Sequence, residues 1–176
     1  MIRILLFSLV WFFSLPALAG KDPHLPSGYV FEDEPEKFVE AYRRAEKEKK
    51  PIQVIFSQLY GCPYCEWMKN NVLGPSQKLK KVWNESYVTV VMDALTNRKV
   101  PIDSKGTVER VRDFRYEHLK IFRGTPSAVF LCPDGSPMLV ETQSGRRPFG
   151  WIGGANDEAG FLAVHENVML LRNSCK

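Results

Sequence analysis

The sequence has little of what several protein classes require. Four cysteines in 176 residues are too few for a disulfide-dense miniprotein, and 12 glycines with 12 prolines are near average usage, which excludes a fibrous or low-complexity chain. The 24 basic residues are scattered among 20 acids rather than gathered in a stripe, so nothing in the charge pattern requires nucleic acid as a partner. With 44% hydrophobic residues, the length suits a single compact domain with an ordinary core.

The one long apolar run lies at the N-terminus. A basic start at Arg3 precedes an apolar stretch over residues 4–15, and an Ala-Leu-Ala site ends at Ala19 ahead of Gly20. This arrangement is typical of a signal peptide, and the run is shorter than the roughly 20 apolar residues of a spanning helix, although an uncleaved anchor stays an alternative. We expect cleavage near Ala19 and a periplasmic or secreted protein, in a compartment where disulfides persist.

The remaining chain alternates between helix and strand patterns. Residues 20–32 show no periodicity and are interpreted as an irregular lead-in to a domain at 33–176, and the polar segment 94–106 as an exposed loop. The other expected elements are helices over 33–50, 62–73, around 79–83, 108–119 and 156–171, and strands at 52–56, 87–92, 128–131 and 138–142. Because helices separate most strands, the order predicts an α/β fold with a mixed central sheet covered by helices on both faces. A Pro-Asp-Gly turn at 133–135 predicts that the last two strands form a β-hairpin.

The chemistry is concentrated at Cys62 and Cys65, which form a Cys-Pro-Tyr-Cys motif directly after the first expected strand and at the start of a helix. Unpaired amides and the dipole at a helix N-terminus stabilise a thiolate, so Cys62 is expected to have a lowered pKa and to act as the nucleophile. Cys65 lies one turn further along and would be the resolving thiol. Pro63 and Tyr64 between them should influence the surroundings of the thiolate.

A cysteine pair can also bind a metal, attach haem or form a structural disulfide. Zinc requires about four ligands, yet there is no second Cys-x-x-Cys, and the other two cysteines and three histidines are isolated. Haem attachment requires a histidine after the second cysteine, where the sequence has Glu66. A purely structural disulfide stays open, since oxidising compartments preserve such pairs. The strand-then-helix context favours redox chemistry.

The cysteine pair, together with Gly124-Thr125-Pro126 ahead of a strand and the turn at 133–135, resembles the thioredoxin superfamily. Within it, the sequence is most similar to the exported thioredoxin-like proteins of the SoxW kind, over about Pro35 to Leu171. The resemblance implies a thioredoxin fold. It also implies a cis peptide bond at Pro126, which would face the cysteines, and a substrate chain that pairs with the backbone of Thr125.

The sequence departs from thioredoxins proper in two places. The strand before the motif, Val54 to Phe56, has no acid where thioredoxins bury one, and the Pro-Tyr dipeptide is the one that glutaredoxins carry. The long N-terminal helix, the export signal and Gly-Thr-Pro fit glutaredoxins poorly. Glutathione is therefore a minor alternative as the partner.

Several other residues were assessed. Cys132 ends a strand and Cys175 lies next to the C-terminus, so they could form a structural disulfide if their Cα atoms lie within about 7 Å. Trp67 is interpreted as a packing residue, His118 and His165 as structural, and the pair at 146–147 as a solvated loop, whereas Tyr60 and Trp151 could rim the site.

These observations predict an exported protein-disulfide oxidoreductase that exchanges two electrons with protein thiols and disulfides and needs no metal or organic cofactor. Because the SoxW-like relatives are kept reduced by a membrane thiol-electron transporter, reduction of partner disulfides is expected. Two alternatives stay open: a disulfide oxidase or isomerase, and a copper-handling chaperone that uses the same thiols.

Overall fold

The computed structural model describes residues 30–31, 35–58, 61–121, 124–152 and 157–175. Its centre is a five-stranded sheet in the order β1-β3-β2-β6-β9. The strands of this sheet are β1 (Val30–Phe31), β2 (Ile52–Ser57), β3 (Val88–Asp93), β6 (Ser127–Leu131) and β9 (Gly150–Ile152). Two short ribbons lie outside it, formed by β4 (Lys99–Pro101) with β5 (Val108–Arg110) and by β7 (Leu139–Thr142) with β8 (Gly145–Pro148).

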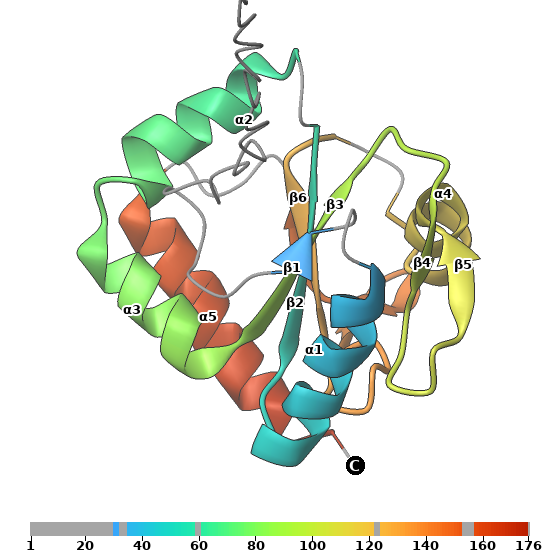
Figure 1. The fold of residues 1–176 in the computed structure, drawn as a ribbon. Coiled ribbons are helices and arrows are strands. Elements are labelled where there is room, and N and C mark those ends of the chain that lie inside the picture. Colours follow the sequence, from blue (N-terminus) through green and yellow to red (C-terminus); the bar gives the residue numbers. More distant parts are fainter. Residues whose placement is uncertain (1–29, 32–34, 59–60, 122–123, 153–156, 176) are drawn as a thin grey trace, which may run out of the picture.

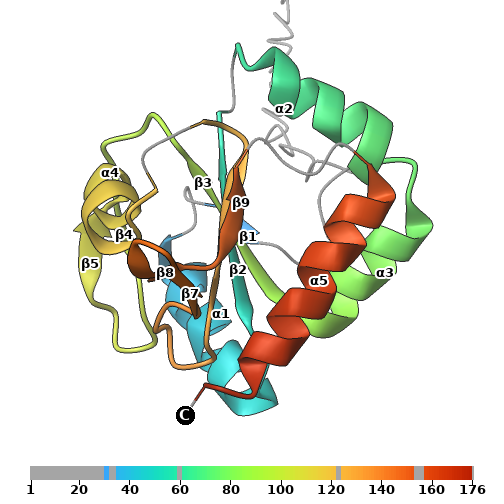
Figure 2. The ribbon, with the colours of Figure 1, turned by 180° about the vertical axis from the view of Figure 1, so that it is seen from behind.

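The helical segments follow the predicted order. They are α1 (Pro35–Glu48), α2 (Pro63–Met68), the π-helical η1 (Lys69–Leu73), α3 (Gln77–Ser86), α4 (Val111–Asp113), the π-helical η2 (Phe114–His118) and α5 (Glu158–Arg172). Figure 1 shows α1 with β4, β5 and α4 on one face of the sheet, and α3 with α5 on the other. The view from behind in Figure 2 shows α5 running beside α3 and β9 at the sheet edge. The predicted mixed sheet with helices on both faces is confirmed.

The sheet is mixed because its central strand β2 pairs in parallel with β3 and antiparallel with β6. Successive side chains of a strand point to opposite faces, and the strands divide between two apolar clusters accordingly. On β2, Val54 and Phe56 face the cluster under α1, whereas Ile55 faces the cluster under α3 and α5. Both faces are therefore apolar, which explains why these strands read as near-continuous hydrophobic runs.

Helix α1 shows how the sequence pattern translates into packing. Phe38, Ala41, Tyr42 and Ala45 recur at the spacing of one helix face, and all four are buried. The basic residues between them are exposed. This helix covers the sheet face opposite the one on which the segment from α2 to η1 packs.

Two predictions of irregular structure were wrong in part. Val30–Phe31, within the expected lead-in, form β1 and pair in parallel with β3, because the adjacent sheet edge offers unpaired backbone groups. The segment 94–106 contains β4, and its side chains at Val100 and Ile102 are buried in the cluster under α1. The expected helix over 108–119 begins later, since residues 108–110 form β5.

The predicted hairpin forms next to its turn but does not continue along β7. The Gly135 amide donates to the Cys132 carbonyl, the Cys132 amide to the Ser136 carbonyl and the Met138 amide to the Phe130 carbonyl. Beyond Met138, β7 pairs with β8 rather than with β6. Strand β9 is the antiparallel neighbour of β6. Pro137 forms an isolated antiparallel bridge with Leu131, and the hydrogen bonds on either side of it are donated by the amides of Cys132 and Met138.

The N-terminal part of the chain is described only from β1 onward. The expected signal peptide and most of the lead-in lie outside the described residues, so the boundaries at 19 and 32 stay predictions. Within the part of the chain that the structure describes, no helix is both long and apolar enough to span a bilayer.

Candidate functional site

Cys62 and Cys65 lie where β2 leads into α2. The two residues form a disulfide with an S–S length of 2.07 Å and a Cα–Cα distance of 5.3 Å. Helix α2 continues without a break into η1, because Lys69 at their junction has helical backbone angles. The motif therefore occupies the first turn of one helical segment over residues 63–73, as the sequence predicts for 62–73.

Cys62 caps this segment. Its backbone is extended, and its Sγ accepts a hydrogen bond from the Cys65 amide at 3.1 Å. The same amide would donate to a Cys62 thiolate once the disulfide is reduced, which favours the ionised form. Cys62 is 8% exposed and Cys65 is 2% exposed, so Cys62 is the more exposed of these two buried residues.

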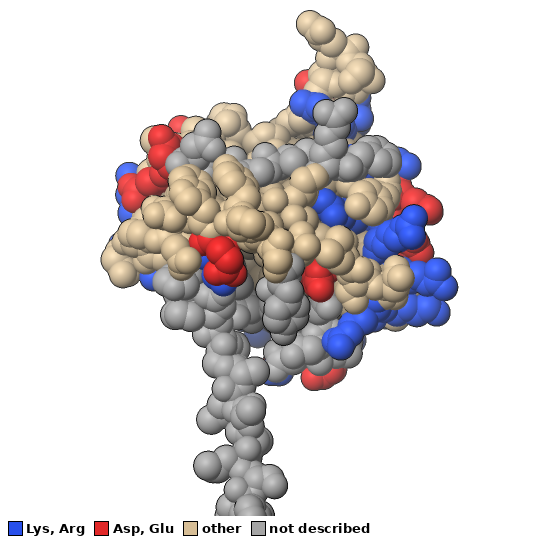
Figure 3. All heavy atoms as spheres, turned by 90° about the horizontal axis from the view of Figure 1, so that it is seen from above, with Lys and Arg blue, Asp and Glu red and all other residues tan. Residues whose placement is uncertain are grey.

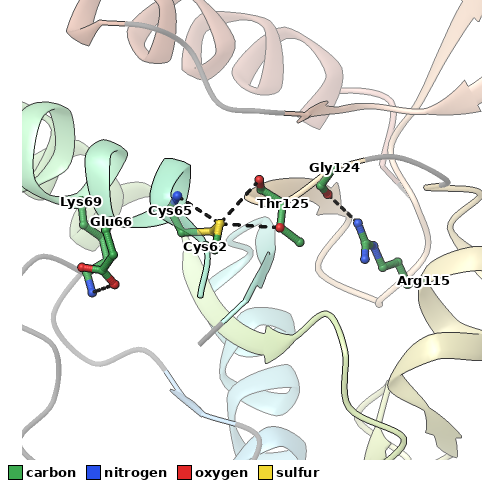
Figure 4. The surroundings of a disulfide bond; sticks show 7 residues. All are labelled: Cys62, Cys65, Glu66, Lys69, Arg115, Gly124 and Thr125. Carbon is green, nitrogen blue, oxygen red and sulfur yellow. Dashed lines mark hydrogen bonds and ion pairs between the residues drawn. A yellow bond between two sulfur atoms is a disulfide. The ribbon is translucent and has the colours of Figure 1, made fainter. Parts of the chain in front are cut away.

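The loop before β6 brings a second backbone segment to the sulfur. The Thr125–Pro126 peptide bond is cis. Figure 4 shows Thr125 facing Cys62, with the Cys62 Sγ 3.8 Å from the Thr125 carbonyl oxygen and 3.7 Å from its Oγ1. Strand β6 lies beside β2 in the sheet, so antiparallel pairing places the start of β6 next to the end of β2. The structure thus brings together the four residues to which the sequence analysis gave catalytic and substrate-binding roles.

Two aromatic side chains lie exposed next to the pair. Tyr64, within the motif, and Trp67 stack with ring centroids 5.5 Å apart and an interplanar angle of 13°. The expectation that Trp67 is a packing residue was wrong, because the residue is 40% exposed. Pro63 is exposed at the helix start, and Glu66 forms an exposed ion pair with Lys69. This end of the molecule offers an uncharged aromatic surface next to the reactive sulfur.

Arg115 is a residue that the sequence analysis did not single out. It lies on η2 and is 3% exposed, and its Nη2 donates to the carbonyl oxygen of Gly124, the residue before Thr125. One signal could have found it: Val111, Phe114 and Arg115 share one helix face, and the arginine occupies an otherwise apolar position. Burial lowers the pKa of Arg115, although a guanidinium keeps its charge over the physiological range.

The second cysteine pair lies away from the site. Cys132 and Cys175 form a disulfide with an S–S length of 2.03 Å and a Cα–Cα distance of 5.5 Å. Cys132 follows the end of β6 opposite to Pro126, so this bond joins the far end of the sheet to the segment after α5. Because it lies away from the Cys62–Cys65 pair, this bond is a structural link. No free cysteine is present in the described residues.

The remaining candidates do not gather at the site. Trp151 is buried against Phe161 in the cluster under α5, so it does not rim the cysteines. His165 bonds to the Tyr87 hydroxyl, and the exposed His118 contacts Glu109. The pair at 146–147 lies exposed on β8 rather than in a loop, and Tyr60 lies outside the described residues. Among described residues, no group of three or more His, Cys, Asp or Glu side chains is placed to hold a metal ion.

Comparison with known proteins identifies the domain. The family described as a thioredoxin-like domain matches residues 38–148. A thioredoxin from Thermus thermophilus is structurally similar, with a TM-score of 0.52 at 18% identity over 84% of this chain and 90% of that one. A DsbH oxidoreductase aligns with a TM-score of 0.49 at 17% identity over 77% of this chain and 81% of that one. No curated protein sequence matches the chain significantly.

Proposed function

The chain belongs to the thioredoxin-like domain family, and from that premise we propose that it is an exported oxidoreductase that reduces disulfides of partner proteins through Cys62 and Cys65. The family and the redox-type cysteine pair indicate thiol–disulfide redox activity. The direction of electron flow and the export are part of this proposal. The single observation that carries it is the Cys62 sulfur at a helix start, facing the Thr125–Pro126 loop across 3.7–3.8 Å.

The reaction uses the more exposed cysteine, Cys62, as the attacking thiol and Cys65 as the resolving thiol. In the reduced protein the Cys62 thiolate attacks one sulfur of a partner disulfide, forming a mixed disulfide while the partner's other sulfur leaves and takes up a proton. The Cys65 thiol loses its proton and attacks the Cys62 sulfur, which releases the second partner sulfur as a thiol. Two electrons and two protons pass to the partner, and the Cys62–Cys65 disulfide of this structure is the oxidised product.

Residues around the pair have separate roles in the proposal. The Cys65 amide, 3.1 Å from the Cys62 Sγ, stabilises the leaving and attacking thiolate. The backbone of Thr125 pairs with the extended partner chain, and Pro126 places that backbone opposite the sulfur. The exposed rings of Tyr64 and Trp67 offer a surface on which uncharged side chains of a partner can pack.

The surface charge is compatible with polypeptide partners. Figure 3 shows the molecule from above, with mostly uncharged side chains over the middle of the described surface and lysine and arginine gathered toward one side. Partner polypeptides with a range of charges can approach such a face, whereas a uniformly charged one would restrict them.

Export is supported by the N-terminal sequence and by the second cysteine pair. The features of residues 1–19 are those that an export peptidase reads. A structural disulfide between Cys132 and Cys175 suits a compartment in which thiols are oxidised. In such a compartment a reductase must be re-reduced, and we propose a membrane thiol-electron transporter as the source of two electrons per cycle.

The test uses the full chain and two variants. Purified reduced wild type should reduce insulin disulfides, Cys62→Ser should not, and Cys65→Ser should accumulate mixed disulfides with partners in the native compartment. Equilibration with thiol buffers gives the reduction potential of the pair. A value near the roughly −270 mV of thioredoxins supports reduction of partners, whereas a value near about −120 mV would make the protein an oxidase. Mature protein that begins at Gly20 outside the cytoplasm supports export, and full-length protein inside it contradicts export.

A further inference from the structure

Behind the Thr125–Pro126 loop lies a charge that the reaction described above does not use. Arg115 is the one charged side chain among the described residues that is buried. Burying a guanidinium is unfavourable unless its charge and its donors are compensated. The groups that contact Arg115 therefore indicate what the buried charge does.

The contacts of Arg115 point toward the loop. Its Nη2 donates to the Gly124 carbonyl at 2.5 Å, and its Nη1 lies 3.4 Å from the Tyr116 hydroxyl. The guanidinium carbon lies 5.6 Å from the ring centroid of Phe56 and 5.1 Å from that of Tyr116, so the two rings enclose it. Its Nε has no hydrogen-bond partner in the described part of the chain.

These contacts place a fixed positive charge one peptide unit from the loop that faces the sulfur. Figure 4 shows Arg115, Gly124, Thr125 and Cys62 in sequence, each contacting the next or bonded to it. The sulfur contacts the Thr125 carbonyl oxygen, one peptide unit joins Thr125 to Gly124, and the Gly124 carbonyl oxygen accepts from the guanidinium. With standard backbone dimensions, the Cys62 sulfur and the guanidinium are therefore at most about 11 Å apart. The rings of Phe56 and Tyr116 are the aromatic neighbours of the guanidinium.

The other charges near the sulfur are weaker candidates for the same effect. On α2, Glu66 and Lys69 form an exposed pair of opposite sign, so their fields largely cancel at the sulfur. Strand β2, which leads to the motif, carries no charged side chain. On β3, Asp93 is partly exposed to solvent, which screens its charge.

We propose that Arg115 is a positioning residue of the exchange reaction: its guanidinium holds the Gly124 carbonyl so that the Thr125–Pro126 backbone stays in register with the partner chain, and its charge favours the Cys62 thiolate. The inference rests on the proposed function of the cysteine pair. The Cys62 thiolate would then be stabilised by two groups: the Cys65 amide, which donates to the sulfur, and the Arg115 cation.

The substitutions separate the charge from the hydrogen bond. Arg115→Met removes both, Arg115→Gln keeps a donor without the charge, and Arg115→Lys keeps the charge with a single donor group. Arg112→Met, an exposed arginine on the adjacent α4, is the matched control. Circular dichroism and urea unfolding show which variants are folded.

Two readouts are taken on each folded variant. The pH midpoint of Cys62 alkylation by iodoacetamide, measured in a Cys65→Ser background, should rise by about half to one unit in the Met and Gln variants. It should stay near that of the wild type in the Lys variant. The KM for a disulfide-bonded peptide should rise about tenfold in the Met variant, because the loop loses a charge-assisted hydrogen bond.

The midpoint decides the outcome, since a purely structural role would change KM without changing it. An unchanged midpoint in the Gln and Met variants overturns the proposal, as does an equal shift in Arg112→Met. If the Met variant does not fold, the comparison of Gln with Lys gives the same decision. A wild type that reduces no disulfide would instead refute the proposed function, which is a different result from active wild type with unaffected variants.

Discussion

Replacing Cys132 and Cys175 together by alanine should lower the free energy of unfolding by about 2–4 kcal/mol. The bond closes a loop with a sequence separation of 43 residues. In the chain-entropy account, a crosslink over a loop of this length lowers the conformational entropy of the unfolded chain, which stabilises the fold by about 4 kcal/mol at 25 °C. The stability that is lost when such a bond is removed is commonly smaller than this value. For a protein of this size the expected loss lowers Tm by about 4–16 °C.

The assay is urea unfolding without reductant, so that the Cys62–Cys65 bond stays intact in every sample. A second variant, with serine in place of both cysteines, controls for side-chain chemistry, because Cys132 is buried and alanine removes some packing. Alkylation and mass mapping of the unreduced wild type establish that the bond is present. A loss below about 1 kcal/mol in both variants would refute the reasoning that this link stabilises the fold by restricting the unfolded chain.

Two further predictions concern stability. In Gly150→Ala the new Cβ would lie 2.0 Å from the Ala128 carbonyl oxygen, so we expect β9 to move off β6 and the free energy of unfolding to fall. The overpacking cost is about 1–3 kcal/mol, and unchanged urea unfolding would contradict the close pairing of these strands. Burial lowers the pKa of His165, so the unfolded chain binds a proton at this residue more readily than the folded chain does. The contribution of neutral His165 to the free energy of unfolding is therefore present above about pH 6.5 and is lost as the pH falls through the pKa of His165 in the folded protein. His165→Gln should flatten the pH dependence of Tm in that range, and a variant whose pH dependence equals that of the wild type would rule the assignment out.

Much of the fold could be predicted because its signals are local. The face of α1 and the buried β2 and β3 are set by apolar spacing within a few residues. The position of the cysteine pair follows from that, since a strand followed by a helix places the motif at a helix start. The cis bond at Pro126 could be expected from family resemblance alone, because no local pattern distinguishes it from an ordinary proline before a strand.

The rest depends on partners that are distant in sequence. Strand β7 is expected beside β6 because a turn connects them, but beyond Met138 the chain leaves β6, β7 pairs with β8, and β9 is the antiparallel neighbour of β6. Arg115 was missed because its role depends on Gly124, which the fold brings to it from beyond the helix. The exposure of Trp67 was missed because a large aromatic residue in a helix is commonly buried, whereas the face that Trp67 occupies on α2 is exposed.

The alkylation rate of Cys62 as a function of pH, measured in the Cys65→Ser variant with the Cys132–Cys175 bond intact, tests the central claim directly. A sulfur capped by the amide of residue 65 and backed by a buried cation should react with a pH midpoint well below the value of about 8.5 for a free cysteine. A midpoint at or above about 8.5 would show that the start of α2 does not activate this thiol, and the redox account would lose its physical basis.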